Sequence, residues 1–252
     1  MKKLKNIIKL SILAAVLGFT LSGCVNVTYS GGSGSKESIN GKGEMITKEY
    51  PVTKYNSVVI DVNAAIVYTA ADSAIVKVEL QENLAECLYI SVVNEQLVVR
   101  SDKDFITNDD KTPVIYITAP TLNEMIFEGF VKMKESDPIQ SSELHLSIDG
   151  SLNGKLAVDA ETLVWDFNGV GNIALSGRAS RADFTLDGAG TLNALELETD
   201  NASVDLNGAG DISLSCSDTL DIQIDGAGTV NYRGTPSIRQ EISGVGSVNQ
   251  VD

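Results

Sequence analysis

Carboxylate and amide side chains stand at regular intervals before pairs of glycines in the C-terminal half of the chain. Aspartates followed by glycines are typical of calcium-binding repeats, which need a nine-residue period to bring several oxygens to one ion. Here the motifs are 19, 20, 18 and 18 residues apart. If each repeat forms one coil of a stack, Asp187 and Asp225 lie about 9.6 Å apart, too far to share an ion. We therefore expect no metal site.

Enzymes that cleave polysaccharides on a stacked β-fold gather carboxylates as acid and base, often with Arg or Lys beside them. The acids of this chain are instead spread one per repeat. The only histidine, His145, alternates with Leu144 and Leu146, which indicates an outward surface position. Arg178 and Arg181 fall in a predicted loop over residues 177–183 and are interpreted as solubilising residues. We predict no catalytic residues. Gly-x-Gly here precedes a strand, not the helix of a dinucleotide site, so we predict no cofactor.

The regular repeat predicts architecture more strongly than activity. A period this short cannot be a chain of separate domains, so each unit is expected to be one coil of a stacked structure. We predict an all-β fold, a right-handed parallel β-helix (β-solenoid) with about 18–20 residues per coil. The glycines are interpreted as structural, placed where the backbone bends or packs closely. They are Gly169, Gly171, Gly188, Gly190, Gly208, Gly210, Gly226, Gly228, Gly244 and Gly246.

Alignment on the glycines produces apolar columns at even spacing, which predict the inward faces of β-strands. Trp165 and Phe167 fall in these columns and are therefore interpreted as core residues, not as a platform for sugar rings. Gln240 and Gln250 replace apolar residues in the last unit, as expected of a terminal cap. The two columns before the motif are Leu146, Trp165, Phe184, Val204, Ile222 and then Ile148, Phe167, Leu186, Leu206, Ile224, Ile242; those after it are Ile173, Leu192, Ile212, Val230, Val248 and then Leu175, Ala194, Leu214, Tyr232.

Two outward columns test the same register. The first residue of each motif alternates between acid and amide as far as Asp225 and is Ser243 in the last unit. Each unit has one acid in the pair that this residue forms with the outward residue two places earlier, and the acids alternate between the two columns until Gln223 and Glu241 shift the phase. Carboxylates stacked directly at about 4.8 Å would repel by about 0.9 kcal/mol even in water. The alternation lowers this repulsion and supports in-register stacking. The pairs are Ser147 and Asp149, Asp166 and Asn168, Thr185 and Asp187, Asp205 and Asn207, Gln223 and Asp225, and Glu241 and Ser243.

The N-terminus is typical of a signal peptide over residues 1–23. Lysines precede a short apolar stretch, Leu10 to Leu21, which is too short to span a bilayer. The run Leu21-Ser22-Gly23-Cys24 resembles a bacterial lipobox. The resemblance implies that Cys24 is lipidated and becomes the new N-terminus, which places the protein in the cell envelope, lipid-anchored, periplasmic or at the cell surface.

The rest of the chain is globular in composition, with 43% apolar and 21% charged residues. Residues 24–45, rich in Gly and Ser, are expected to form a flexible tether. Residues 46–140 alternate with period two and predict irregular β coils, with helix expected only in a turn or two over 82–88. Residues 105–113 are expected to form a solvated loop, and residues 141–252 the regular coils.

The formal net charge is −15, and loss of the lysines in the signal peptide makes it more negative. This excess repels nucleic acid and anionic lipid, so the partners expected are neutral or cationic. Cys87 and Cys216 are expected to lie several coils apart as buried free thiols.

The serial [Asp/Asn]-Gly-x-Gly-x-[Ile/Leu/Val] units, the lipobox and the upstream runs at 58–62, 75–80 and 97–99 resemble the head GIN domain family of autotransporter adhesins. The resemblance covers residues 46 to the C-terminus and implies a right-handed parallel β-helical envelope protein. It carries no catalytic residues.

We expect a non-catalytic envelope lipoprotein whose surface binds glycan or protein. The alternatives are a structural or sensory envelope component that binds a membrane partner, and a polysaccharide lyase or hydrolase. An exposed edge at an imperfect cap can stack on another, which leaves homo-oligomers open.

Overall fold

The computed structural model describes residues Lys36–Asp252, which form one compact unit. The predicted signal peptide, Cys24 and most of the tether lie outside the described residues. None of the helices in Lys36–Asp252 is long and apolar enough to cross a membrane.

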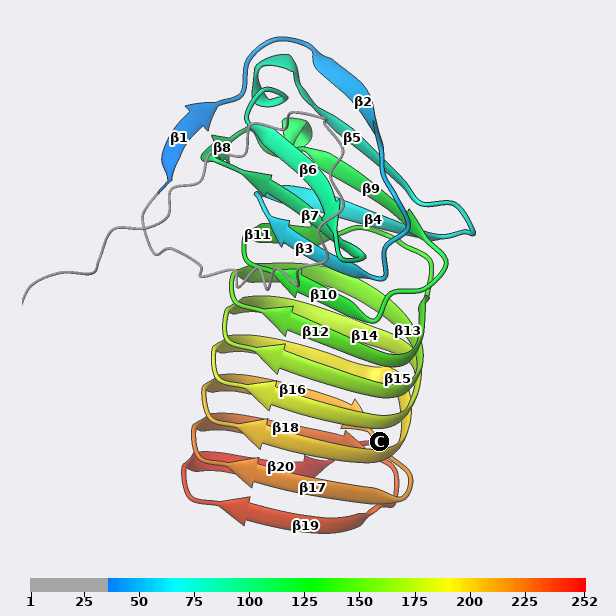
Figure 1. The fold of residues 1–252 in the computed structure, drawn as a ribbon. Coiled ribbons are helices and arrows are strands. Elements are labelled where there is room, and N and C mark those ends of the chain that lie inside the picture. The colour runs from blue at the N-terminus through cyan, green and yellow to red at the C-terminus, as the bar shows by residue number, and fades with distance from the viewer. Residues whose placement is uncertain (1–35) are drawn as a thin grey trace, which may run out of the picture. The chain divides into compact units, whose positions relative to one another are not determined.

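The described unit is all β, with two short 3-10 turns (Figure 1). Its elements are β1 (Glu37–Asn40), β2 (Met45–Pro51), β3 (Ser57–Asp61), β4 (Ala64–Ala70), β5 (Ile75–Gln81), η1 (Glu82–Leu84), β6 (Leu88–Val93), β7 (Gln96–Ser101), β8 (Lys103–Ile106), η2 (Asp109–Lys111), β9 (Val114–Ala119), β10 (Glu124–Phe127), β11 (Phe130–Met133), β12 (Ile139–Ile148), β13 (Ser151–Phe167), β14 (Val170–Leu186), β15 (Ala189–Leu206), β16 (Ala209–Ser215), β17 (Thr219–Ile224), β18 (Ala227–Arg233), β19 (Ser237–Ile242) and β20 (Val245–Gln250).

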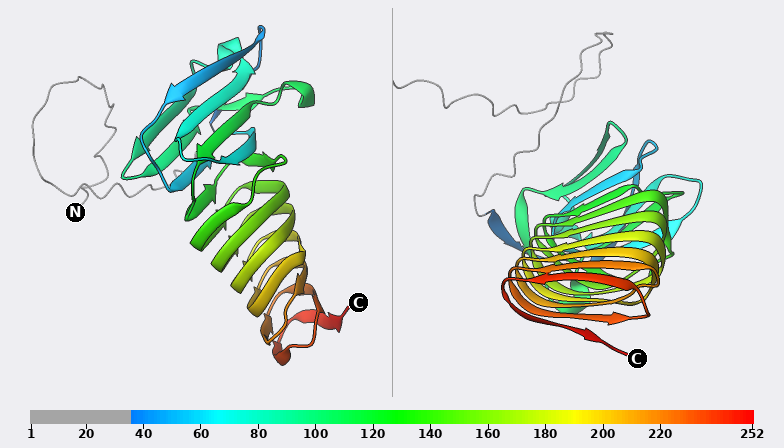
Figure 2. Two further views of the ribbon diagram at one scale, coloured as in Figure 1. Left: turned by 90° about the vertical axis from the view of Figure 1, so that its right-hand side faces the viewer. Right: turned by 90° about the horizontal axis from the view of Figure 1, so that it is seen from below.

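The C-terminal half is the predicted β-solenoid. Consecutive repeats pair in parallel along their length: β13 with β14, β14 with β15, and β15 with β16 and β17. The strands therefore stack coil upon coil (Figures 1 and 2). This confirms the fold class, and it excludes the antiparallel hairpins that the repeat could otherwise have formed. The handedness of the coil stays a prediction.

Each regular coil has two faces joined by the Gly-x-Gly turn on one side and by a bend on the other. In β14, residues 170–176 form one face, residues 177–180 the bend and residues 181–186 the other face. The predicted loop at Arg178 and Arg181 is therefore wrong, because the strand continues through the bend. Arg178 lies 3.6 Å from Asp200, and Arg181 donates two hydrogen bonds to Asp183.

The core is one continuous cluster, and the predicted inward columns line it. Trp165 and Phe167 are buried and stack on each other with ring centroids 5.9 Å apart, which confirms their assignment to the core. Three column residues near the end of the stack depart from the prediction: Ile242 is 41% exposed, and Tyr232 and Val248 are half-buried.

The N-terminal part extends the stack but is not purely parallel. β3 and β4 pair in parallel with β10 and β11, so they form a coil of the same stack. β5 is antiparallel to β2 and β9, and β6 is antiparallel to β7. The folded part begins before the predicted residue 46, since β1 already pairs with β8.

Candidate binding surfaces

The glycine pairs lie at a turn where the backbone of one coil approaches that of the coil before it closely. A Cβ atom placed on any of the ten predicted structural glycines would overlap the backbone oxygen of the residue one coil earlier. For Gly188 that oxygen belongs to Gly169, and for Gly190 it belongs to Gly171. Residues with side chains are therefore excluded by close approach of the backbone.

The polar residue before each glycine pair belongs to a ladder along the same edge. Asn168 Nδ2 donates to Asp149 Oδ1 (3.2 Å), and Asn207 Nδ2 donates to Asp187 Oδ1 (2.8 Å). Each amide thus stands next to a carboxylate, which explains physically why acid and amide alternate.

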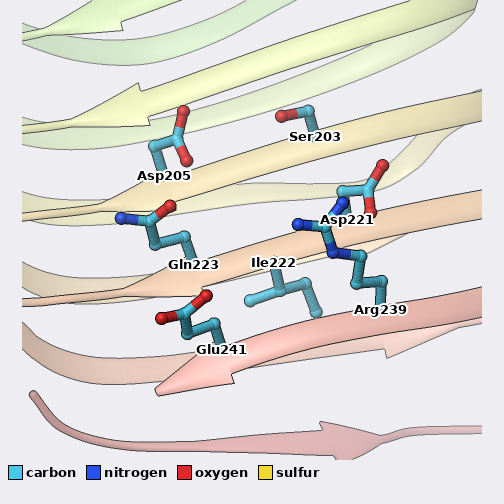
Figure 3. Close-up of a pocket in the computed structure, with 7 residues that line it drawn as sticks. All are labelled: Ser203, Asp205, Asp221, Ile222, Gln223, Arg239 and Glu241. Atoms are coloured by element: carbon cyan, nitrogen blue, oxygen red, sulfur yellow. The ribbon is translucent and has the colours of Figure 1, made fainter. Parts of the chain in front are cut away.

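The half-coils before the motif expose an acidic face. The three outward columns nearest the motif hold eight acids against Arg239 and His145, and Arg181, at the start of the same face, pairs with Asp183. Burial raises the pKa of Asp205, and the carboxylates of Asp183, Asp225 and Asp187 raise it further. A shallow cavity of about 130 Å³ lies among its last three coils (Figure 3). The acids are Asp149, Asp166, Asp183, Asp187, Asp205, Asp221, Asp225 and Glu241.

His145 lies on this acidic face, half-buried, with Nε2 2.7 Å from Asp166 Oδ2. Its outward position agrees with the prediction. The carboxylate of Asp166 is the hydrogen-bonding partner of the imidazole ring. Within Lys36–Asp252 no three His, Cys, Asp or Glu side chains are grouped so as to hold a metal ion. Cys216 is buried and Cys87 half-buried, and both are free.

A cluster of three acids lies where the acidic face meets the N-terminal coil. Burial raises the pKa of Glu128, and Asp61 and Asp149 raise it further, whereas the Lys36 ammonium lowers it. Lys36 Nζ is 2.5 Å from Asp61 Oδ1. No amide separates the carboxylates of Asp61, Glu128 and Asp149. The positive charge of Lys36 offsets part of the repulsion among them instead.

The half-coils after the motif expose a face of different character, which we call the neutral strip. Its two outward columns contain amides and hydroxyls, with one acid and one base among twelve residues. Several of the side chains contact the next coil: Asn249 Nδ2 donates to Asn231 Oδ1, and Asn231 Nδ2 donates to Ser213 Oγ, both at 3.3 Å. The columns are Asn153, Asn172, Thr191, Asp211, Thr229, Ser247 and Lys155, Ala174, Asn193, Ser213, Asn231, Asn249.

An apolar edge borders the neutral strip. It is formed by the middle residue of each Gly-x-Gly motif, exposed in every coil, and Phe130 occupies the same column at the N-terminal end. Phe130 is 68% exposed and Val245 81%. The members are Phe130, Ser151, Val170, Ala189, Ala209, Ala227 and Val245, of which Ser151 alone is buried.

A groove of about 580 Å³ lies at the Phe130 end of this edge. Phe130 and the 51%-exposed Ile106 line it, together with Asn63 and Thr112. The predicted loop at 105–113 contributes to this groove, although Phe105 itself is buried in β8 and η2 interrupts the segment. Sequence reasoning missed Phe130 because its coil has a single glycine, Gly129, in place of the pair.

Comparison with known proteins agrees with this architecture. A family model described as putative auto-transporter adhesin, head GIN domain, matches residues 54–236. The chain belongs to this family. None of the curated proteins matches it.

Solved structures share the fold of this head GIN domain. A putative adhesin from Bacteroides fragilis is 24% identical, with a TM-score of 0.78 over 85% of this chain and 100% of that one. A putative lipid binding protein from Parabacteroides distasonis is 22% identical, with a TM-score of 0.67 over 86% and 100%. A putative adhesin from Parabacteroides merdae is 20% identical, with a TM-score of 0.63 over 86% and 100%. At these identities the likeness concerns the fold alone.

Proposed function

We propose that this protein is a non-catalytic envelope lipoprotein that binds a neutral glycan along the neutral strip and its apolar edge. The observation that carries the proposal is the pairing of a row of exposed amides and hydroxyls with a parallel row of small apolar side chains. A sugar ring has both hydroxyl groups and an apolar C–H face. The strip offers matching groups for each.

The repeat favours a polymeric ligand over a small molecule. The same kinds of side chain recur at each coil, about 4.8 Å apart. A chain of sugars lying along the strip would make several weak contacts at once, and linked contacts raise the overall affinity without any single strong site.

The groove beside Phe130 supplies a deeper position at one end of the strip. The exposed ring offers a large apolar surface, and Asn63 and Thr112 provide polar groups in the same groove. A mostly apolar hollow with a few polar groups is the usual form of a site for small organic groups. We assign one terminal sugar or side branch of the ligand to this groove.

The two faces differ in the ligands they favour. The acidic face repels anionic polymers, including nucleic acid, because its carboxylates are stacked over six coils. The neutral strip has one acid, Asp211, balanced by Lys155, and so imposes no such penalty. A neutral ligand on the strip is thus consistent with the strong negative charge of the whole chain.

Attachment to the envelope rests on the sequence at Cys24. A lipid on this cysteine and the Gly/Ser segment after it would hold the folded unit near a membrane without a spanning helix. Replacing Cys24 by Ser should release the protein from the membrane fraction. In intact cells, protease that frees the folded unit would support adhesion at the surface, whereas full protection would favour an inward-facing structural role.

Binding is tested with a glycan and peptide array probed with the chain from residue 25 onward. We expect signals on neutral glycans that weaken at least about fivefold in Phe130→Ala and in Thr191→Glu, which places a charge in the middle of the strip. Gln223→Glu is the matched control, since it adds the same charge to the exposed acidic face. Equal losses in all three variants, or binding restricted to anionic or peptide ligands, would contradict the proposal.

A further inference from the structure

Within the described residues, no strand covers the outer edge of the last coil. Within Lys36–Asp252, β19 pairs only with β17, and β20 pairs only with β18. Ile238 and Ile242 are 37% and 41% exposed, whereas Leu220 and Ile224, one coil earlier, are buried. An unpaired strand edge with exposed apolar side chains is a template for pairing with another strand.

The hydrogen bonds of β19 show which backbone groups face the open edge. Ser237 N donates to Asp218 O, and Ser243 N donates to Ile224 O, so the odd-numbered residues point toward β17. Because the N–H and C=O of one strand residue point to the same side, Ile238, Gln240 and Ile242 direct theirs away from the stack. These residues can accept a new antiparallel neighbour.

The sequence of β19, Ser237-Ile238-Arg239-Gln240-Glu241-Ile242, is complementary to itself when reversed. An antiparallel copy centred on Gln240 places Arg239 opposite Glu241 of the second copy, and Ile238 opposite Ile242. Gln240 then meets its own equivalent. Neither a parallel copy nor a shift by two residues gives this match. We propose that two copies of the chain join end to end through β19, with Gln240 on the two-fold axis.

The backbone pattern agrees with the side-chain match. Centring on Gln240 makes Gln240 and the Ile238–Ile242 pairs the hydrogen-bonded ones, which are the residues that face the open edge. Arg239 and Glu241 then occupy non-hydrogen-bonded pairs, in which the Cα atoms are closest, about 4.5 Å apart. Opposite charges in such pairs stabilise a sheet, and like charges destabilise it.

Arg239 and Glu241 are available for this contact. Figure 3 shows both on the last strand of the acidic face, below Asp221 and Gln223. Neither belongs to any of the six ion pairs formed within Lys36–Asp252. Within the described residues, both side chains are therefore free of an ion pair.

The second strand of the last coil fits the same axis. Val245 N donates to Gly226 O and Val251 N to Tyr232 O, so Gly246, Val248 and Gln250 face the open edge. Val248 lies four residues after Gly244, as Gln240 lies four residues before it. One two-fold axis through the coil can thus pass both, and centring β20 on Val248 pairs Ser247 with Asn249.

The test is the oligomeric state of the chain from residue 25 onward, which retains every described strand and the whole described core. Sedimentation velocity across a concentration series should show a monomer–dimer equilibrium. Arg239→Glu should raise the dissociation constant at least about tenfold, because two like-charge pairs replace two opposite ones. The double variant Arg239→Glu/Glu241→Arg should restore the dimer. Lys155→Glu, with the same charge change on the neutral strip, should leave it unchanged.

A backbone variant separates end-to-end pairing from loss of folding. Gln240→Pro removes an N–H that faces the open edge, so it should abolish the dimer while leaving the melting temperature nearly unchanged. Glu241→Pro removes an N–H that faces β17 and should lower the melting temperature. A wild-type chain that stays monomeric, a dimer that survives both Arg239→Glu and Gln240→Pro, or a double variant that stays monomeric would overturn the proposal.

Discussion

Gly190 shows at the scale of one residue why the repeat keeps its glycines. A Cβ atom there would overlap the backbone oxygen of Gly171, and backbone cannot move aside without disturbing the stack. We expect Gly190→Ala to lower the free energy of unfolding by about 1–3 kcal/mol, as overpacking does elsewhere.

Chemical denaturation followed by circular dichroism measures this change. The matched control is Ala189→Val, one residue earlier on the exposed apolar edge, where valine already occurs at positions 170 and 245. We expect this control to be nearly neutral. Equal destabilisation by the two variants would mean that close approach of the backbone does not explain the glycines.

Asp205 gives a prediction that depends on pH. Burial and the neighbouring carboxylates raise its pKa in the folded protein, so the folded state binds its proton more tightly than the unfolded chain does. The resulting penalty is fully present above the raised pKa and disappears as the pH falls below the pKa of the unfolded chain.

Asp205→Asn should therefore raise the melting temperature at pH 8 and have little effect at pH 3. Thermal melts of the variant and the wild type across this range measure the difference. Asp211→Asn, on the neutral strip, serves as the control and should show a smaller change at pH 8. A stabilisation of Asp205→Asn that is the same at both pH values would contradict the electrostatic explanation.

Single residues differ in how well the sequence predicts them. Trp165 and Phe167 could be assigned to the core because each belongs to a column in which an apolar residue occurs in five or six successive coils. A single apolar residue would not have distinguished an inward position from an exposed one. The contact between His145 and Asp166 is harder to predict. The residue directly opposite His145 on the next coil is Val164, and Asp166 lies two residues further along that strand. Phe130 has no glycine pair to mark its coil, so no alignment on that motif could place it.

At the scale of the element, the repeat length varies in the bend and at the end of the face that precedes it. The 20-residue spacing between Gly188 and Gly208 corresponds to a register shift after Ala174, where β15 has one extra residue. The next coil has an 18-residue spacing, because β16 and β17 are separated by residues 216–218 only. Residues 170–174 and 181–186 keep their register with the next coil on either side of this shift, since a slip of one residue would turn every side chain to the other side.

This division predicts where insertions are tolerated. One glycine inserted between Ser217 and Asp218, which are exposed in the bend, should leave the protein soluble and lower its melting temperature only slightly. One glycine inserted between Phe184 and Thr185 should prevent folding, because it places Leu186 outside and Thr185 inside. Solubility and circular dichroism of the two variants, identical in composition, decide the matter; similar behaviour would mean that the faces do not set the register.

Strand direction was the element property that the sequence did not reveal. Alternation of apolar and polar residues at 75–80, and the β-branched run at 97–99, predict strands but are the same for parallel and antiparallel pairing. β5 is antiparallel to β9, and β7 is antiparallel to β6, and no glycine repeat marks these strands. The loop predicted at 177–183 failed for a related reason: small and charged residues there form a bend within a continuous strand.

At the scale of the whole described unit, the two ends of the stack are closed differently. The N-terminal end is covered by additional strands, among them β5 and β7. The C-terminal end has only the polar substitutions Gln240 and Gln250, which lie one coil below Ile222 and Tyr232. The cap thus reduces the apolar surface at the open end without covering its backbone edge, which is the surface that the end-to-end dimer would use.

Removing the last coil tests how much this polar cap contributes. A chain that ends at Arg233 exposes the edges of β17 and β18 with Ile222, Ile224 and Val230 uncovered, all of them buried in the intact protein. We expect this chain to aggregate during expression, because unpaired edges with apolar residues recruit further strands. The same truncation with Ile222→Gln and Tyr232→Gln recreates the native cap one coil earlier and should recover soluble protein. The soluble fraction after centrifugation measures both; if the two truncated chains are equally soluble, the glutamines do not act as a cap, and the open end is protected by some other property of the last coil.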